Sequence, residues 1–301
     1  MIILSLFDGI SCGRVALERA GIKIDKYYAS EIDKYAIQIA KINYPDTIHL
    51  GDITNWKNWD IETPDIIIGG SPCQGFSFAG KQLNFEDPRS KLFFEFVDIL
   101  KHYKPKYFLL ENVRMKQEYQ DIISGQLGVK PIMINSSRVS AQNRVRLYWT
   151  NIQGVEQPED KEIYLKDVVE DGLVDRDKSY CIDANYFKGG NLKSYFEKRR
   201  RQLVFQKPLR ITQAGGGGQG QRVYAIEGKS VTLSALSGGL GAKTGLYYIE
   251  DNFRKLTPLE CERLQTLPDN YTEGVSNTQR YKMLGNGWTV DVIKHILLKI
   301  N

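Results

Sequence analysis

The sequence is poor in the side chains that bind metals. Its 301 residues include only 4 cysteines and 3 histidines. The cysteines are far apart and form no C-x-x-C pair, so the sequence contains no zinc-ligand spacing; they are Cys12, Cys73, Cys181 and Cys261. A chain of this length needs no disulfide framework to fold. We therefore expect a protein of the reducing cytoplasm that holds no metal.

Long apolar runs are also missing. No stretch approaches the roughly 18 consecutive apolar residues of a membrane-spanning helix. The N-terminal MIILSLFDGISCG is apolar but short, lacks a charged start and soon becomes acidic and glycine-rich. This pattern predicts a buried first strand and not a signal peptide, and we expect no contact with a membrane.

The composition is that of an ordinary globular protein, with 42% hydrophobic and 26% charged residues. The formal net charge of +5 permits a polyanionic partner without requiring one. Composition alone therefore leaves nucleic-acid binding open.

Strand-like and helix-like segments alternate through the first half of the chain. The expected strands are Ile2–Phe7, Lys26–Glu31, Asp65–Gly70 and Lys106–Glu111, and the expected helices are Cys12–Ala20, Lys34–Asn43 and Ser90–His102. This alternation predicts an α/β fold with a doubly wound, mostly parallel sheet. Ligands of such sheets bind beyond the carboxyl ends of the strands.

The middle of the chain has a different character. From about Gln157 to Asp251 it is polar and glycine-rich, and Glu197–Gln202 is a basic run. Two interpretations stay open for this basic run: a solvated helix face, or a surface that follows phosphates. Helix signals return at Thr257–Glu260 and in the amphipathic Trp288–Ile300. We expect a first domain at 1–155, a smaller domain at 156–252, and a segment at 253–301 that returns to the first.

Glycines and acids occur where the first strands end. Gly9 and Gly13 lie in the first strand-to-helix turn, but they do not form G-x-G-x-x-G, so the fingerprint of dinucleotide-binding enzymes matches poorly. Glu31 ends the second strand, where a carboxylate can hold a ribose diol. Asp52 follows the third strand, where it could meet an adenine amino group. Tight turns and surface carboxylates would explain the same residues.

Cys73 lies in the loop GGSPCQGFS, and the residues alone leave it as an inert thiol, a metal ligand or a nucleophile. Thiolate is the nucleophilic form, and an ordinary pKa of about 8.5 leaves a minority ionised. Glu111 follows the next apolar run, and Arg144 and Arg146 alternate on an expected strand, so both face one side. Together these groups suit the addition of sulfur to an electron-poor ring; a protease would need a histidine base.

Ordered motifs carry a family resemblance. FDG, SEID, GDI, SPCQGFS, ENV, QNRVR, RKLTPLECERLQ and GNGWTVDVI occur in this order, and the chain resembles the DNA cytosine-5 methyltransferases nearly from end to end. The likeness is weakest between about Ile152 and Arg210. LSLFDGISCGRVALERAGI and WTVDVIKHI also resemble the animal de novo branch of that family. GGQGQRVYAIEGKSVTLSALSGGLGAKTGLYY resembles the recognition segment of compact bacterial enzymes that modify GCGC-type sites.

The resemblance implies methyl transfer from S-adenosylmethionine to C5 of cytosine in a short specific sequence of double-stranded DNA. Cys73 would attack C6 of a flipped base, and Glu111 would contact N3 and the exocyclic amine. Arg144 would help to activate the base and fix Glu111, and Arg146 would sit on the O2 side. Residues 1–155 would then be the catalytic and cofactor-binding domain, and 156–252 the target-recognition domain.

The same resemblance implies two binding sets. The cofactor set is Phe7, Gly9, Glu31, Ile32, Asp52, Ile53, Pro72 and the turn that runs from Asn286 to Val290. The DNA set is Ser77 and Lys81 in a closing loop, Gln219 in place of the flipped base, and Arg222 and Thr232 at major-groove edges. Some residues depart from the family pattern without removing a catalytic group: Ala79, Leu236, Gly287 and Trp288. Leu236 stands where the GCGC-type segment has a tyrosine, which puts a copy of that specificity in doubt.

Other functions remain as alternatives. A tRNA cytosine-5 methyltransferase of this family would carry a Cys-Phe-Thr signature that this sequence lacks. An inactive DNA-binding relative would typically lose the nucleophile, and a nicotinamide oxidoreductase would need a different first glycine turn. We expect a monomer in the cytoplasm of a bacterial or phage-infected cell, associated with the nucleoid. A partner restriction endonuclease and the exact recognition sequence are left open.

Overall fold

The computed structural model describes residues 1–72, 88–189, 195, 197–205, 212–213, 222–224, 246–247 and 253–300. For 88–90, 212–213, 222–224 and 246–247 only the backbone is described. The α-helices are α1 (Cys12–Arg19), α2 (Lys34–Asn43), α3 (Pro88–Tyr103), α4 (Gln117–Leu127), α6 (Pro258–Leu264), α7 (Asn277–Asn286) and α8 (Val290–Leu297). Short 3-10 helices span Ile53–Asn58 (η1), Ser136–Arg138 (η2), Leu165–Asp167 (η3) and Tyr186–Lys188 (η4).

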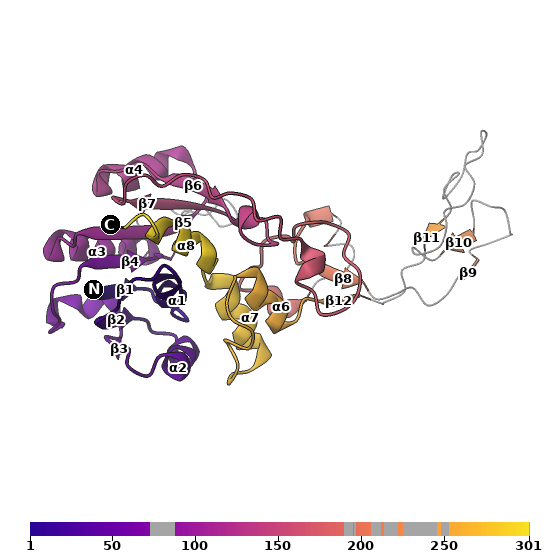
Figure 1. Cartoon of the computed structure of the whole chain (residues 1–301), viewed down its shortest axis with the longest axis horizontal. Coiled ribbons are helices and arrows are strands. Elements are labelled where there is room, and N and C mark those ends of the chain that lie inside the picture. Colours follow the sequence, from indigo (N-terminus) through magenta and orange to yellow (C-terminus); the bar gives the residue numbers. More distant parts are fainter. Residues whose placement is uncertain are drawn as a thin grey trace.

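A seven-stranded sheet organises the first half of the chain (Figure 1). Its order is β3-β2-β1-β4-β5-β7-β6. The strands are β1 (Ile2–Leu6), β2 (Lys26–Ser30), β3 (Ile48–His49), β4 (Ile66–Gly69), β5 (Tyr107–Val113), β6 (Ile132–Asn135) and β7 (Val145–Thr150). Strands β1 to β5 pair in parallel, whereas β7 runs antiparallel to both β5 and β6. The expected doubly wound, mostly parallel sheet is confirmed.

Alternation along the strands divides the core between the two faces of the sheet. Ile66, Ile68 and Leu109 belong to a cluster that includes side chains of α1 and α8. Their neighbours Ile67 and Leu110 belong to a second cluster with α3 and α4. Because successive side chains of a strand point to opposite faces, Glu111 lies on the α1 and α8 face together with Leu109.

The last helix returns to the first domain. Figure 1 shows α8 beside α1, and Arg19 Nη1 lies 2.9 Å from Asp291 Oδ1. Before it, α6 begins at the expected capping box, in which Thr257 Oγ1 accepts from Glu260 N and the Glu260 carboxylate accepts from Thr257 N. The amphipathic pattern of Trp288–Ile300 thus corresponds to α8, whose buried side chains pack in the same cluster as those of one face of the sheet.

Between these parts the described chain has few regular elements. Strands β8 (Leu203–Phe205) and β12 (Phe253–Lys255) pair antiparallel, and β9 (Thr212–Gln213), β10 (Arg222–Tyr224) and β11 (Leu246–Tyr247) form a small sheet. The basic run is not one helix face as one interpretation had it, because Arg199 and Arg201 adopt positive φ of 49° and 57°. Within the described ranges, no helix has the length and apolar character needed to cross a membrane.

Candidate functional site

A cavity of about 460 Å³ opens beyond the carboxyl ends of the central parallel strands. It lies where β1 has β2 on one side and β4 on the other, the point at which ligands of such sheets bind. Its walls come from the turns after β1, β2, β3 and β4, from the end of β5 and the start of β7, and from the turn between α7 and α8. The volume is within the range of roughly 300–1,000 Å³ that is usual for small-molecule sites.

Glu31 is fixed at the mouth of the cavity by backbone amides. Its Oε2 accepts from Gly9 N at 2.8 Å, and its Oε1 accepts from Ile32 N at 2.7 Å and Asp33 N at 2.8 Å. Gly9 has a φ of +60°, in the left-handed region that glycine adopts without strain. The turn after β1 thus brings its amide to the carboxylate that follows β2.

Asp8 directly precedes Gly9 in the turn after β1, and its side chain is buried. It accepts hydrogen bonds from Ser11 Oγ at 2.6 Å and from Tyr27 Oη at 2.7 Å. Burial raises the pKa of the Asp8 carboxyl above its ordinary value, although the hydroxyl donors act in the opposite direction. Asp8 is therefore a buried acid that braces the first turn.

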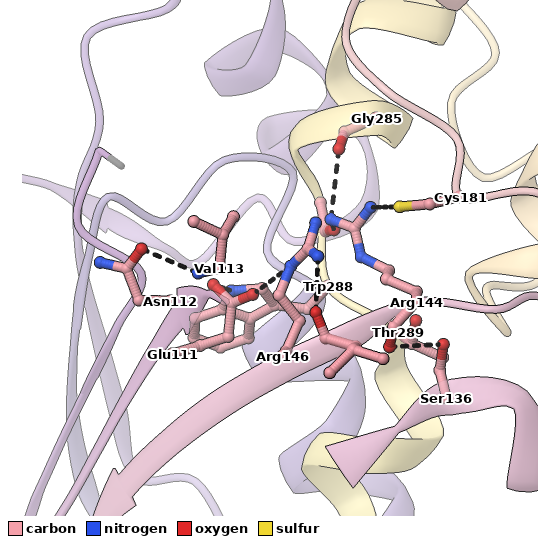
Figure 2. Close-up of polar contacts among 12 residues, drawn as sticks. Glu111, Asn112, Val113, Ser136, Arg144, Arg146, Cys181, Gly285, Trp288 and Thr289 are labelled. Carbon is pink, nitrogen blue, oxygen red and sulfur yellow. Dashed lines mark hydrogen bonds and ion pairs between the residues drawn. The ribbon is translucent and has the colours of Figure 1, made fainter. Parts of the chain in front are cut away.

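Glu111 is held from two sides (Figure 2). Arg146 Nε lies 2.9 Å from its Oε1, and Trp288 Nε1 donates to its Oε2 at 3.1 Å. The register explains the ion pair, because Glu111 pairs with Tyr148 and Arg146 pairs with Val113. Glu111 and Arg146 are thus diagonal neighbours on one face of the antiparallel pair. The Glu111 carboxyl is nearly buried and reaches the cavity.

Arg144 has a different set of partners from the one the sequence predicted. Its guanidinium donates to the carbonyl oxygens of Ile182 at 3.1 Å, Gly285 at 3.2 Å and Gly287 at 2.8 Å. It also reaches Cys181 Sγ at 3.3 Å (Figure 2). The expectation that Arg144 fixes Glu111 was wrong: Arg146 makes that ion pair, because Arg144 precedes β7 and faces backbone carbonyls.

Asn112 fastens the segment that leads toward Cys73. Its Nδ2 lies 3.2 Å from Ser71 Oγ and 3.4 Å from Ser71 O, and both residues are buried. Pro72, the next residue, lines the cavity. Cys73 itself lies outside the described residues.

Two of the described cysteines, Cys12 and Cys261, have buried and unreactive thiols. Burial raises the pKa of the Cys12 thiol to about 12, and it raises the pKa of Cys261 well above the ordinary value. Both thiols therefore stay protonated near neutral pH and make poor nucleophiles.

The cavity gathers most of the described residues that the sequence singled out. They are Phe7, Gly9, Glu31, Ile32, Asp52, Ile53, Pro72, Glu111, Arg144, Arg146 and Asn286. Val290 does not line the cavity; it is fully buried at the start of α8. Ser77, Lys81, Gln219 and Thr232 lie outside the described residues, and for Arg222 only the backbone of β10 is described.

Sequence reasoning gave no role to two residues that contribute to this site: Asp8 and Asn112. They lie inside the motifs FDG and ENV, so their positions were available as a signal. Trp288 was expected only as part of the Asn286–Val290 turn beside the cofactor and as a departure from a family pattern. Its contact with Glu111 joins residues 177 positions apart. In the part of the chain that the structure describes, no group of histidine, cysteine, aspartate and glutamate could hold a metal ion.

Comparison with known proteins gives a consistent result. The family model described as "C-5 cytosine-specific DNA methylase" matches residues 1–301. The Type II methyltransferase M.HhaI of Haemophilus parahaemolyticus is 32% identical over 99% of this chain and 93% of its own length. The Type II methyltransferase M1.ScrFI of Lactococcus lactis subsp. cremoris is 31% identical over 99% of this chain and 77% of its own length.

Solved structures share the fold. A DNMT2 mutant from Spodoptera frugiperda superposes with a TM-score of 0.64 at 20% identity, covering 98% of this chain and 99% of that one. Dnmt2 of S. pombe superposes with a TM-score of 0.58 at 17% identity, covering 98% and 96%. At this level of identity the match speaks for the architecture alone.

Proposed function

The chain belongs to the C-5 cytosine-specific DNA methylase family and is a DNA (cytosine-5-)-methyltransferase, and we propose that it acts through Cys73 on a cytosine flipped out of a short specific duplex sequence. The observation that carries this proposal is the convergence on one cavity of Pro72, which precedes Cys73, with Glu111 and Arg146. A cytosine C6 is shielded inside the duplex, so the base must leave the stack, at a cost of about a few kcal/mol.

The cavity suits S-adenosylmethionine. Glu31 has its carboxylate oriented by backbone amides and keeps lone pairs for a ribose diol, while Asp52 and the exposed Ile32 stand where an adenine would lie. The other proposed contacts are Phe7, Gly9, Ile53, Pro72 and Asn286. The bound cofactor supplies the methyl group that C5 takes. Val290 is left out of this set because its side chain is buried elsewhere.

The covalent step uses the sulfur of Cys73. Its thiolate forms a bond to C6, and the electron pair of the C5–C6 double bond becomes available at C5. After C5 has gained the methyl group, with S-adenosylhomocysteine as the leaving group, the C5 proton passes to solvent, the sulfur–C6 bond breaks, and the thiolate and the aromatic ring are restored. Cys12 and Cys261 could not replace this thiol, since burial keeps both protonated.

Glu111 and the arginines act on the ring. Glu111 contacts N3 and the exocyclic amine and favours the ring protonated at N3, which draws electron density from C6 and favours the attack. Arg146 holds Glu111 at 2.9 Å and adds positive charge on the O2 side. Arg144 acts on the wall of the cavity, through the carbonyls of Gly285 and Gly287.

DNA recognition is assigned to the smaller domain. We divide the chain into a catalytic and cofactor-binding domain (1–155), a target-recognition domain (156–252) and a returning segment (253–301). Ser77 and Lys81 close on the DNA, Gln219 fills the gap left by the flipped base, and Arg222 and Thr232 read a short GC-rich site of the GCGC type. The protein acts as a monomer without a metal, in the bacterial cytoplasm with the nucleoid, where a restriction endonuclease can be its partner.

Two experiments test this mechanism. Duplex DNA incubated with S-adenosylmethionine should yield 5-methylcytosine by mass spectrometry, and Cys73→Ala should abolish the product. Cys261→Ala removes an inert thiol on α6 and should keep the activity. A duplex with 5-fluorocytosine at the target should become covalently joined to Cys73. An adduct at another residue, or none from an active enzyme, would overturn the covalent mechanism.

Bisulfite sequencing of a plasmid from cells that express the chain tests the recognition proposal. Methylation confined to GCGC-type sites supports it, and methylation at another sequence refutes that specificity while leaving the chemistry intact. Methylation of tRNA and not of DNA would refute the choice of substrate.

A further inference from the structure

Glu111 must present one fixed edge to the base, and its strand alone does not ensure this. A carboxylate has about four acceptor sites on its two oxygens. Arg146 Nε occupies one site on Oε1, at 2.9 Å, and the indole N–H of Trp288 occupies one on Oε2, at 3.1 Å. Each oxygen is therefore held by its own donor, and the two donors come from different parts of the chain.

The indole ring of Trp288 occupies a space that exists because positions 13 and 70 are both glycine. A Cβ added to Gly70 would lie 2.9 Å from Trp288 Nε1 and 3.0 Å from Glu111 Oε2. A Cβ added to Gly13 would lie 3.3 Å from Cζ3 of the same ring. The ring thus rests between α1, the turn after β4 and the side chain of Glu111. Any side chain at position 70 would press against both the donor and the acceptor.

The hydrogen bond from the indole N–H of Trp288 is strengthened by the charge and the burial of its acceptor, Glu111. Glu111 is 8% exposed, and a hydrogen bond to a charged group in such a place is stronger than one between neutral groups. Trp288 also lines the cavity that Glu111 reaches. The ring is partly buried and anchored at the start of α8, so its N–H is aimed before the base arrives.

We propose that Trp288 is a positioning residue of the methyl-transfer site, whose indole N–H acts with Arg146 to fix the Glu111 carboxyl for the pyrimidine edge. This inference rests on the proposed role of Glu111. It assigns a function to a residue that departs from the usual bacterial cofactor turn.

Trp288→Phe is the direct test, because it keeps an aromatic ring in this space and removes the donor. We expect kcat to fall about tenfold, as the loss of one hydrogen bond to a charged group implies. The KM for DNA and the Kd for S-adenosylmethionine should stay within about twofold, since uniform binding is untouched. Adduct formation with 5-fluorocytosine DNA should slow by the same factor as kcat.

Trp149→Phe is the matched control. Trp149 is buried in β7 on the opposite face of the sheet, and its Nε1 donates to Ser124 Oγ at 3.0 Å. Trp149→Phe loses an indole hydrogen bond to a neutral hydroxyl far from Glu111 and should keep kcat. Gly70→Ala is the second variant: its Cβ would crowd both the donor and the acceptor and displace one from the other, so it should reproduce the kinetic defect of Trp288→Phe with the indole still present.

A double-mutant cycle separates positioning from packing. If Trp288 acts through Glu111, Trp288→Phe should slow adduct formation in the wild-type background and have no further effect in a Glu111→Gln background. Equal effects in both backgrounds, or an unchanged kcat for Trp288→Phe in an active enzyme, would overturn the inference. A wild-type enzyme that makes no 5-methylcytosine would instead refute the proposed function.

Discussion

At the scale of the residue, the site depends on a few buried or half-buried polar groups that are held by donors from other parts of the sequence. Asp8, Glu31 and Glu111 are each held by hydrogen-bond donors from other segments. Because an unsatisfied buried polar group costs about 1–3 kcal/mol, these partners fix the side chains in place. The cavity is therefore shaped before any ligand binds.

Asp8 should make stability depend on pH. Its pKa is raised by burial above 3.8, so between that value and the higher pKa of the folded state the native protein binds more protons than the unfolded chain. Stability therefore falls as pH rises through this window. We expect thermal unfolding to show that Asp8→Asn gains stability relative to the wild type as the pH rises.

Asp269 provides a control of opposite sign. Its pKa is lowered by the hydrogen bonds from Arg263, so its contribution is present above 3.8 and is lost as pH falls. Asp269→Asn should thus lose stability relative to the wild type as the pH rises. A difference between Asp8→Asn and the wild type that stays constant from pH 4 to 8 would contradict the raised pKa.

At the scale of the element, α7 packs directly against the backbone at Asp183 and Ala184, and Gly285 makes this close approach possible. A Cβ on Gly285 would lie 2.2 Å from the carbonyl carbon of Asp183 and 2.3 Å from Ala184 N, both of them backbone atoms that precede η4. The close approach lets Arg144 bond to the carbonyls on both sides of this contact, at Ile182 and Gly285.

Gly285→Ala should therefore destabilise the protein by about 2 kcal/mol or more, because backbone must move to admit the methyl group. Gly125→Ala in α4 is the matched helical control. A Cβ there meets nothing within 4 Å, so the change should stabilise the protein by about 0.5–1 kcal/mol. Chemical denaturation would measure both, and equal effects would show that α7 does not need this contact.

At the scale of the whole molecule, Arg144 joins three stretches of chain. Its guanidinium links the start of β7 to Ile182 and to the carbonyls at the end of α7, Gly285 and Gly287. The side chain is 3% exposed, so these hydrogen bonds are shielded from water. The backbone at Ile182 and the end of α7 are thus tied to the sheet at the cavity itself.

Arg144→Lys should lower the melting temperature of the ligand-free protein by several degrees, because one ammonium cannot reproduce the planar fork of donors and leaves buried carbonyls unpaired. Arg138→Lys is the control, since Arg138 makes a single hydrogen bond from Nη1 to Pro158 O at 3.1 Å. A melting temperature for Arg144→Lys equal to that of the wild type would refute the link.

The bounds of a helix or strand could be predicted from the sequence where they depend on neighbouring residues alone. The expected helix at Lys34–Asn43 has the bounds observed for α2, where Asp33 accepts hydrogen bonds at the helix start. The expected strand at Lys106–Glu111 proved to extend to Val113, so Glu111 is inside β5 and not after it. β5 continues to Val113 because β7 pairs with it as far as that residue. This pairing partner comes from a later part of the chain, so the local pattern of β5 could not show where the strand ends.

The sequence by itself determined the doubly wound sheet, the place of the cavity at its carboxyl edge and a part of the set of residues that line it. Alternating hydrophobicity and turn residues act over a few positions and can be read in order. Only the tertiary structure decided that Arg146 and Trp288 hold Glu111 while Arg144 ties the wall together. Those contacts depend on the antiparallel register of β7 and on the glycines beside the indole ring, because hydrogen bonds form between whichever groups the packing brings within reach.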